Sequence, residues 1–368
     1  MKRKRKLPMI LLCILVFVFA LAGAGYYVFT HYFSSSNFVS DEHVEINYDY
    51  LAALKESEIE MDVEAEMESE TELDHLTLDA SAFAEGYVGE FESETELDLS
   101  AIQQASAEQI EGTYNLLLIG VDRRNDDWYG NSDVMILATI NYDQKKLFLT
   151  SFMRDLYADI PGFGVMKLNA AHAIGGGPLL VETIETNYGV SIDNYARVDF
   201  SAMSGIVDIV GGVDIDVSEA EAKVANSYIT EMCKLQEKNY DDYAITGSGM
   251  MHLNGMQAVA YSRIRYVGNS DYERTSRQRE VLSDMFKKVG TLSLTEMNEV
   301  INEILPLVTH NVSQVTMVKL MAQVPELIGF EAVTDRVPYD GLFTSRGGLL
   351  VPDMAATAAR LQETIYAK

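Results

Sequence analysis

Hydrophobic and polar positions from residue 114 onward follow strand and helix patterns in alternation. Residues 114–121 (YNLLLIGV) are a continuous apolar run of the kind found in buried strands. Residues 133–141 and 145–152 are two further apolar runs separated by three residues, which predicts a β-hairpin. Residues 194–200 and 213–217 add two shorter strand patterns. The first half of this region is therefore rich in predicted strands.

Helical patterns fill the intervals between these strands. They cover residues 168–174, 178–188, 201–210, 253–262, 274–289, 294–304 and 313–323, and a last helix follows Pro352-Asp353 and runs to the C-terminus. Strands that alternate with helices predict an α/β fold, here an α/β/α sandwich with a mixed central sheet. Residues 112–368 are long enough for one such domain, and the polar segment 219–248 is predicted to be an insertion in it.

An uncharged, mostly apolar run from residue 7 to residue 30 follows five basic residues at positions 2–6. A helix of that length spans a hydrocarbon core of about 30 Å, and the basic residues orient its N-terminus toward the cytoplasm. We predict a single-pass protein of the cell membrane with residues 1–6 cytoplasmic and its C-terminal domain extracellular. The alternative is a cleaved signal peptide with Ala22-Gly23-Ala24 at its cleavage site, which gives the same compartment.

Most of the net charge of −28 comes from residues 41–111, which carry 23 acidic residues and one basic residue. The motif ESETELD occurs there twice, at residues 68–74 and 92–98. Acidic residues that alternate with small or apolar ones cannot bury enough surface to offset the entropy of ordering. Residues 31–111 are therefore predicted to be a disordered acidic stalk. The alternative, a calcium-binding array, is disfavoured because the segment lacks the glycine-containing loop that a calcium site normally needs.

The cysteine content, the motifs and the net charge of residues 112–368 exclude several common classes of protein. Cys233 is the only cysteine after the apolar run, so this region cannot form an internal disulfide. The sequence has no HExxH, GxSxG or GxxxxGK motif. A net charge of −11 on residues 112–368 and the predicted extracellular location argue against nucleic acid as a partner.

Five of the chain's fourteen arginines lie in one stretch, RIRYVGNSDYERTSRQR, at residues 263–279. Arg263 and Arg265 are two positions apart, so both point to one side of an extended segment. Arg274, Arg277 and Gln278 share one face of a helix because they are three and four positions apart. Four converging guanidiniums suit a pyrophosphate, whose oxygens they bind bidentately while staying charged at any ordinary pH.

The alternative for this stretch is a surface ion-pair network with its own acidic residues, Asp271, Glu273 and Glu280. Arg279 lies five positions after Arg274 and points away from the shared face, so we leave it out of the predicted site. If the arginines serve a ligand, they repel one another when the site is empty. Replacing Arg263 or Arg265 is then expected to leave the empty domain as stable as before, or slightly more stable.

Charged residues also stand at the ends of the predicted strands. Asp122 and Arg124 follow the first strand, Asp133 begins the second, and Arg154 and Asp155 follow the third. Loops at strand ends are where α/β sheets bind ligands. We predict that Asp122 and Asp133 hold Mg²⁺, with Mn²⁺ as an alternative, and that Arg124 and Arg154 contact phosphate beside it.

Seven segments of this chain resemble the LytR-CpsA-Psr family and occur in that family's order. They are LLLIGVDRR, NSDVMILATIN, LFLTSFMRDLYADIPG, KLNAAHAIGGGP, GGVDIDV, LNGMQAVAYSRIRY and DYERTSRQREVL. The resemblance implies a membrane-anchored, Mg²⁺-dependent phosphotransferase of Gram-positive-type bacteria. Such an enzyme moves a glycopolymer, either teichoic acid or capsular polysaccharide, from a polyprenyl-pyrophosphate carrier to a peptidoglycan acceptor through a phosphodiester. The alternative is a non-enzymatic surface module that binds or senses polyprenyl-linked cell-wall intermediates.

The resemblance also implies roles for single residues. Asp122 and Asp133 match the Mg²⁺-linked aspartates and, with Arg154, make up the predicted catalytic residues. The substrate-binding set predicted for the pyrophosphate is Arg124, Arg154, Arg263, Arg265, Asp271, Arg274, Arg277 and Gln278. The family usually has Arg where this chain has Asn131, and the acidic repeat is not part of its pattern. A lipid tunnel is implied too, and the apolar helices 178–188, 201–210 and 281–289 could border it.

Overall fold

The computed structural model describes residues 37–41, 46–51, 53, 112–122, 129–265, 267–268, 270–327, 329–346 and 349–367. The predicted anchor at residues 7–30 and most of the predicted stalk lie outside these ranges. Among the described residues, no helix combines the length and the apolar character needed to cross a membrane.

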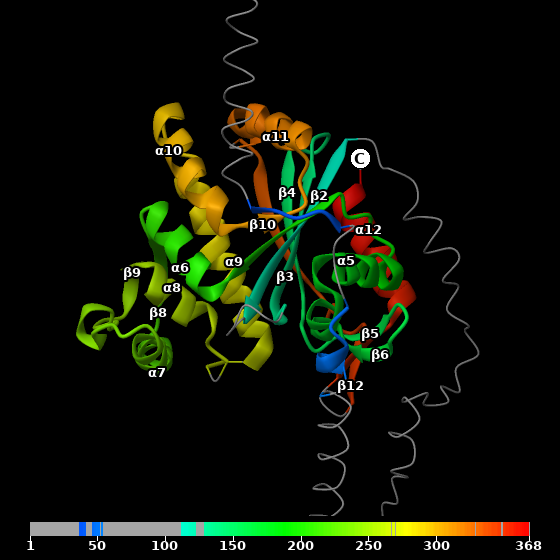
Figure 1. The fold of residues 1–368 in the computed structure, drawn as a ribbon, viewed down its shortest axis with the longest axis horizontal. Coiled ribbons are helices and arrows are strands. Elements are labelled where there is room, and N and C mark those ends of the chain that lie inside the picture. The colour runs from blue at the N-terminus through cyan, green and yellow to red at the C-terminus, as the bar shows by residue number, and fades with distance from the viewer. Residues whose placement is uncertain are drawn as a thin grey trace, which may run out of the picture.

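The centre of the molecule is a seven-stranded sheet with the order β1-β10-β7-β2-β3-β4-β11 (Figure 1). The strands are β1 (Asn37–Phe38), β10 (Thr309–His310), β7 (Asn194–Asp199), β2 (Thr113–Asp122), β3 (Asn131–Asn141), β4 (Lys146–Phe152) and β11 (Glu331–Val337). Three neighbouring pairs are parallel (β1 with β10, β7 with β2, β4 with β11) and the other three are antiparallel. The predicted mixed central sheet is therefore confirmed, as is the hairpin of β3 and β4.

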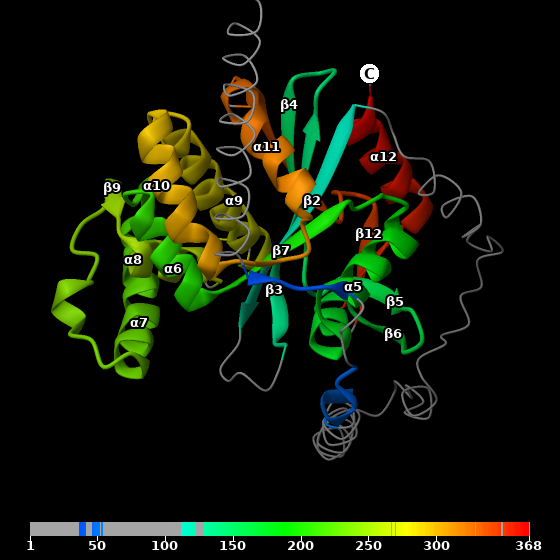
Figure 2. The same cartoon turned by 45° about the horizontal axis from the view of Figure 1, so that its top comes forward.

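Helices α5 (Leu168–Tyr188) and α12 (Met354–Tyr366) cover one face of this sheet (Figure 2). Alternate residues of β2, Leu117 and Ile119, belong to the same buried cluster as Leu180 of α5 and Leu361 of α12. Two small hairpins extend this layer, β5 (Tyr157–Ile160) with β6 (Gly164–Lys167) and β12 (Phe343–Arg346) with β13 (Leu349–Pro352). The sequence patterns did not predict these hairpins, because their strands are only four residues long.

The other face of the sheet, which we call the α9 face, lies toward α6 (Phe200–Ile209) and α9 (Ser270–Val289). Its apolar side chains come from the alternate positions of β2, β3 and β4: Leu118, Val134, Ile136, Ala138, Leu147 and Leu149. Leu282 of α9 packs against them. Helices α10 (Leu294–Ile304) and α11 (Gln314–Leu327) lie on the same side of the sheet as α9 (Figure 2). Helices on both sides of the sheet give the predicted sandwich.

A second buried cluster stands beside the sheet and is built on a hairpin of β8 (Val213–Val217) and β9 (Gly249–Leu253). Between the two strands the chain forms α7 (Glu219–Leu235) and the short helix η2 (Tyr240–Asp242), and α8 (Gly255–Ser262) follows β9. The segment 219–248, predicted as an insertion, thus lies between two strands that pair with each other. Its α7 begins at a capping box of Ser218 and Glu221 and buries the free Cys233.

The glycines at positions 175–177 interrupt α5, as the sequence predicted. Gly175 and Gly176 have non-helical backbone angles, and Gly176 has a φ of 64°, which favours glycine. A Cβ on Gly177 would lie 2.4 Å from the ring of Tyr195. The kink therefore lets α5 approach β7 closely. The helix expected to begin at Arg274 instead begins at Ser270, because the polar residues before Arg274 carry no apolar periodicity that marks a helix.

Two short segments of the predicted stalk pack on the domain, which corrects its boundaries of 31–111. Residues 37–38 form β1 and pair with β10 at the sheet edge. Ile46, Tyr50 and Leu51 pack against the cluster under α5, and the Tyr50 hydroxyl donates a hydrogen bond to the side-chain oxygen of Asn131 at 2.7 Å. Ile46, Tyr50 and Leu51 supply large apolar or aromatic side chains at close spacing, although Glu45 and Asp49 lie beside them.

Two deletions distinguish the docked part of the stalk from the rest. We expect deletion of residues 54–110 to leave the melting temperature unchanged. Deletion of residues 41–110 also removes the burial of Ile46, Tyr50 and Leu51, and should lower the melting temperature by about 4 °C or more. Calorimetry of both variants against the full chain makes the comparison. Equal melting temperatures for the two deletions would show that residues 46–51 contribute nothing to the fold.

Candidate active site

The start of β3 carries an irregularity that places Asp133. Gly120 of β2 pairs with Val134, but the next residue, Val121, pairs with Ser132. Asp133 is therefore an extra residue with no partner on β2, as in a β-bulge. Bulges re-aim side chains and are frequent beside active sites. Gly120 permits this geometry, since a Cβ there would lie 2.9 Å from Cβ of Val134.

Asp133 belongs to a chain of ion pairs at the end of the sheet. The Arg154 Nη1 donates to the Asp133 Oδ1 at 2.8 Å, and the Arg154 Nε lies 3.5 Å from the Asp155 Oδ2. The Nζ of Lys167 lies 2.9 Å from the other oxygen of Asp155. The side chains of Asp133 and Arg154 are 22% and 23% exposed, so the pair is accessible to a ligand. The structure thus brings together two of the three predicted catalytic residues.

The other predicted strand-end residues are described only in part. Asp122 is the last residue of β2 and pairs with Asn131 of β3, so its backbone lies two positions from Asp133. The Asp122 side chain, the Asp271 side chain and the whole of Arg124 lie outside the described residues. Lys167, which had no role in the sequence analysis, joins the site through Asp155. The motif KLNAAHAIGGGP contains Lys167, but its lysine carried no spacing that pointed to a partner.

Arg277 is held by protein groups instead of facing solvent. Its Nε donates to the Glu221 Oε1 at 2.8 Å, and its two terminal nitrogens donate to the carbonyl oxygens of Ile264 (3.2 Å) and Val267 (3.0 Å). The side chain is only 6% exposed. Arg277 therefore anchors the loop that carries Arg263 and Arg265. Sequence spacing placed it among the pyrophosphate contacts because it shares a helix face with Arg274.

Arg263 stacks between two aromatic rings. Its guanidinium lies 5.1 Å from the ring centroid of Phe200 on α6 and 5.0 Å from that of Tyr228 on α7. Its Nη2 is 3.9 Å from a carboxylate oxygen of Glu231. Cation–π contacts with two rings hold the guanidinium in place. The nearby charges are therefore balanced in part even without a ligand.

This stacking reverses the expected effect of removing Arg263 from the empty domain. Arg263→Ala should lower the free energy of unfolding by about 1–2 kcal/mol, because two ring contacts are lost. In a double-mutant cycle with Tyr228→Leu, measured by denaturant unfolding, the two losses should be less than additive. Strict additivity, or a more stable Arg263→Ala variant, would show that repulsion among the arginines outweighs the stacking.

Arg265, Arg274 and Gln278 complete the arginine stretch. Arg265 is half-buried after the end of α8, and Arg274 is almost fully buried in the second turn of α9. The Gln278 side chain reaches back to the carbonyl oxygen of Ser262 at 3.5 Å. The loop and the helix are therefore folded toward each other, as the sequence predicted for the segment around Gly268.

Arg279, which the sequence analysis left out, links this helix to the sheet. Its Nη1 donates to the hydroxyl of Ser151 on β4 at 2.9 Å, three residues before Arg154. It does point away from Arg274, but toward the sheet and not toward solvent. No sequence signal could have found this contact, since it depends on how α9 crosses β4.

The described carboxylates of the site do not form a complete metal site by themselves. Among the described side chains, no group of three or more His, Cys, Asp or Glu residues has the arrangement of a metal site. Asp133 offers one oxygen, Oδ2, that accepts no hydrogen bond from a described residue, while Arg154 holds Oδ1. Mg²⁺ is commonly held by only one or two carboxylates together with substrate phosphates. Asp133 can therefore serve as one carboxylate ligand of a Mg²⁺ ion that is also bound by substrate phosphates.

The helices expected to border a lipid tunnel do not lie on one side of the sheet. Residues 178–188 belong to α5, whose Leu180 and Ile184 pack with Leu117 on the face opposite α9. Residues 201–210 and 281–289 belong to α6 and α9, on the other face. All three helices are apolar, so their sequences could not distinguish the faces. Only α6 and α9 can border a lipid-binding surface on the α9 face.

A model of the LytR_cpsA_psr family matches residues 76–342, which is more than half of the chain. The chain belongs to the LytR_cpsA_psr family. Biofilm regulatory protein A of Streptococcus mutans is 32% identical over 232 residues, which cover 60% of this chain and 54% of that protein. The polyisoprenyl-teichoic acid–peptidoglycan teichoic acid transferase TagU of Enterococcus faecalis is 36% identical over 202 residues, 54% of this chain and 60% of TagU. The chain thus spans little more than half the length of these two relatives.

The fold of this chain is similar to that of a solved structure, TagT bound to LIIa-WTA. It superposes on this chain with a TM-score of 0.54 at 25% identity and covers 69% of this chain and 91% of that chain. The similarity therefore extends over about two thirds of this chain and most of that one. The mixed sheet with helices on both sides is therefore the fold of this family.

Proposed function

We propose that this protein transfers a glycopolymer from a polyprenyl-pyrophosphate carrier to peptidoglycan through a phosphodiester bond. The observation that carries this proposal is the Asp133–Arg154 ion pair on the bulged strand, in a chain of the LytR_cpsA_psr family. The name of TagU, a teichoic acid transferase acting on a polyisoprenyl-linked substrate, supports it. A cluster of guanidiniums at a strand-end site suits a substrate with two linked phosphates.

In the proposed reaction, a sugar hydroxyl of peptidoglycan attacks the phosphorus that bears the glycopolymer. A bond forms from the hydroxyl oxygen to this phosphorus, and the bond from phosphorus to the bridging oxygen breaks. Polyprenyl phosphate leaves with the electron pair, and the hydroxyl proton ends on solvent. Fixed guanidiniums stabilise the negative charge that develops on the phosphates in the transition state.

The protein supplies these guanidiniums in fixed orientations. Arg154 is held by Asp133 and Asp155, and Arg263 is held by its two aromatic rings. Arg277 bonds to Glu221 and to two carbonyl oxygens of the loop that carries Arg263 and Arg265. Charged groups held in place before the substrate arrives need no reorganisation during the reaction. These contacts therefore orient the guanidiniums before the substrate binds.

We propose Mg²⁺ as the cofactor, with Asp133 and Asp122 as its protein ligands. When bound, the ion would neutralise phosphate charge and polarise the phosphorus–oxygen bonds. The Asp133 oxygen that accepts no hydrogen bond from a described residue supports this assignment. Mn²⁺ prefers similar oxygen ligands and is the expected substitute. We also propose that residues 7–30 anchor the protein in the cell membrane with its domain outside, where a lipid-linked substrate and peptidoglycan are both present.

The test is release of polyprenyl phosphate from a lipid-linked glycopolymer by the full chain in detergent micelles with a peptidoglycan acceptor. We expect turnover that requires added Mg²⁺, stops with EDTA and returns with Mg²⁺ or Mn²⁺. Turnover in EDTA would show that the reaction needs no metal ion, while the protein would still be a transferase. Tight binding of the lipid-linked substrate without any turnover would instead support the non-enzymatic binding module.

A further inference from the structure

The described part of the chain contains one buried cation that lacks a close counter-ion. Arg279 is 9% exposed, and its only hydrogen bond to a described residue goes to the neutral hydroxyl of Ser151. No described carboxylate lies within ion-pair distance of its guanidinium. Burial and the neighbouring Arg336 lower the pKa of Arg279 to about 10, although Asp335 acts against this from farther away. A buried charge without a partner is costly, so such a residue points to an anionic ligand.

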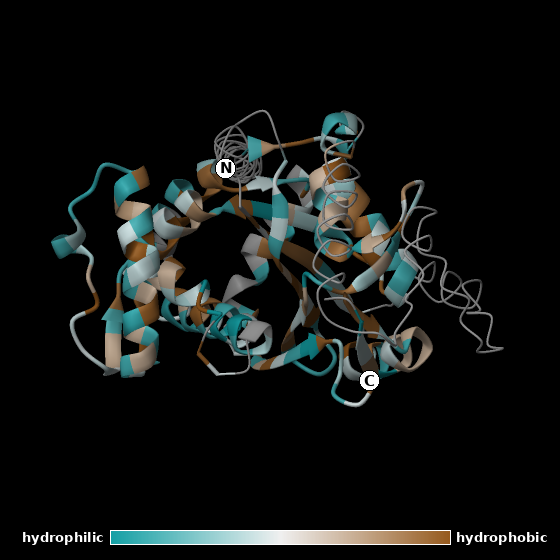
Figure 3. Cartoon of the chain, turned by 90° about the horizontal axis from the view of Figure 1, so that it is seen from below, coloured by the Kyte–Doolittle hydropathy of each residue, from teal (hydrophilic) through white to brown (hydrophobic). Residues whose placement is uncertain are grey.

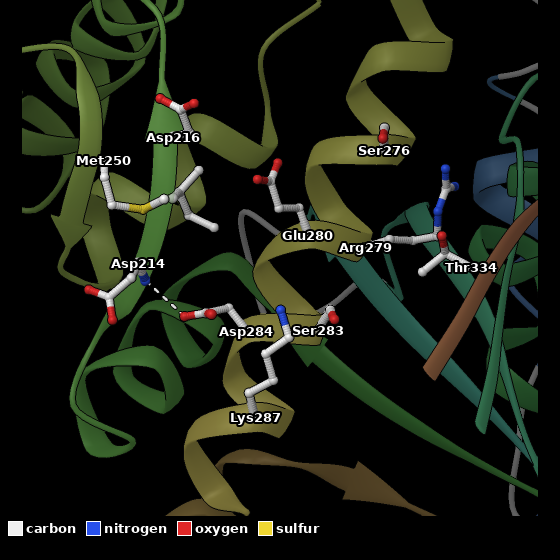
Figure 4. Close-up of a pocket in the computed structure, with 11 residues that line it drawn as sticks. Asp214, Asp216, Met250, Ser276, Arg279, Glu280, Ser283, Asp284, Lys287 and Thr334 are labelled. Carbon is white, nitrogen blue, oxygen red and sulfur yellow. Dashed lines mark hydrogen bonds between the residues drawn. The ribbon is translucent and has the colours of Figure 1, made fainter. Parts of the chain in front are cut away.

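A cavity of about 410 Å³ reaches this arginine. Arg279, Ser276, Ser283 and Thr334 line it, together with Glu280 and Asp284 and with residues of the β8–β9 hairpin. Figure 4 shows the guanidinium beside Thr334 of β11, turned away from the carboxylates of Asp214 and Asp216 on the far side of α9. The charged end of Arg279 is therefore on the sheet side of the cavity.

The order of side chains along β4 matches the order of groups in a lipid pyrophosphate. Leu147 and Leu149 lie on the apolar α9 face, Ser151 follows with Arg279 bound to it, and Arg154 stands just past the strand end. Figure 3 shows brown, apolar stretches in the strands at the centre of the molecule. Three residues of extended chain span at most about 11 Å, a distance that two arginine side chains can bridge. Along β4 the order of groups is therefore apolar side chains, a hydroxyl bound to a guanidinium, and a second guanidinium.

We propose that Arg279 and Ser151 form an anion-binding position for the lipid-side phosphate of the carrier, the phosphate that departs as polyprenyl phosphate. This inference rests on the proposed function and adds to it the group that stabilises the leaving phosphate. Arg154 at the strand end then serves the phosphate that stays with the sugar. As the bridging bond breaks, the leaving phosphate gains negative charge, and the Arg279 guanidinium stabilises that charge through its unused donors.

The experiment measures binding of two probes to the full chain in detergent micelles by calorimetry. The probes are geranyl phosphate, which carries only the lipid-side phosphate, and geranyl pyrophosphate. Arg279→Gln should lower the affinity for both probes by the same factor, about tenfold or more, because both share the lost contact. Arg279→Lys keeps the buried charge and the bond to Ser151 but not the forked donors, so it should recover only part of the affinity. Arg360→Gln, on α12 across the sheet, is the matched control and should change neither affinity.

Four outcomes would overturn the proposal. If Arg279→Gln binds both probes as tightly as the wild type does, Arg279 is a structural cation only. If the affinity falls for the pyrophosphate alone, Arg279 contacts the sugar-side phosphate and the assignment is wrong. If Arg279→Gln does not fold, the Arg279→Lys variant decides, and unchanged affinity there removes the role. A wild-type chain that binds neither probe would overturn both this inference and the proposed function, whereas wild-type binding with unaffected variants overturns only the inference.

Discussion

Replacing Arg154 by alanine should lower the turnover of a lipid-linked substrate by about 10²–10³-fold, the usual effect of losing one preorganised donor to a developing negative charge. Arg154 holds the bulged Asp133 through a 2.8 Å ion pair and presents the rest of its guanidinium at the strand end. The stability should change by less than about 1 kcal/mol, because the pair is partly exposed. Steady-state kinetics and thermal unfolding of the same variant separate the two effects.

The matched control for Arg154 is Lys146, at the other end of the same strand. Lys146 forms a 3.9 Å contact with Glu331 on the neighbouring β11, far from the strand-end site. Lys146→Ala should therefore leave turnover unchanged, and Arg154→Lys should keep the charge but recover only part of the rate. An Arg154→Ala variant with wild-type turnover would remove the strand-end ion pair from the mechanism.

Breaking the Arg277–Glu221 pair should have the largest effect on stability. Arg277 is 6% exposed and Glu221 is 13% exposed, so removing either partner leaves a buried charge without its counter-ion. We expect Arg277→Ala to lower the free energy of unfolding by about 3–5 kcal/mol. The loop carrying Arg263 and Arg265 loses its anchor in the same variant, so affinity for geranyl pyrophosphate should fall as well. Denaturant unfolding and calorimetry measure the two losses.

The control for this pair is the more accessible ion pair of Lys288 and Asp214, whose contact is 3.1 Å and whose side chains are 23% and 50% exposed. Lys288→Ala should cost less than about 1 kcal/mol. If Arg277→Ala costs no more than Lys288→Ala, the anchoring role of Arg277 is wrong. The double variant with Glu221→Gln should cost less than the sum of the two single changes, because the charges disappear together.

The Glu221–Arg277 pair also gives a pH dependence with a definite sign. Burial raises the pKa of Glu221, but hydrogen bonds from Ser218 and Arg277 outweigh it and hold the pKa below the usual value of 4.5. A carboxylate with a lowered pKa in the folded state contributes stability above its unfolded pKa and loses it as the pH falls through the folded pKa. The stability difference between the wild type and Glu221→Gln should therefore shrink below about pH 4.5.

The sequence by itself determined the main strands and helices of the fold and the family. The apolar runs of β2, β3 and β4 could only be buried strands, and the capped, amphipathic segments between them could only be helices. The charges at the strand ends and the arginines at residues 263–279 pointed to a phosphate ligand, because residue type alone fixes that chemistry. The motif order gave the family, which the match over residues 76–342 confirms.

The tertiary structure decided which of these residues face one another. Helix periodicity put Arg277 with Arg274 and excluded Arg279, but the crossing of α9 over β4 aims Arg279 at Ser151 and buries Arg277 against Glu221 of α7. Periodicity could not place α5 and α9 on opposite faces of the sheet either, since both are apolar. Spacing along a chain specifies which side chains share one surface of an element, whereas the partner of that surface depends on contacts between residues far apart in sequence. Glu221 and Arg277 are 56 positions apart, and Ser151 and Arg279 are 128 apart, so only the folded chain brings each pair together.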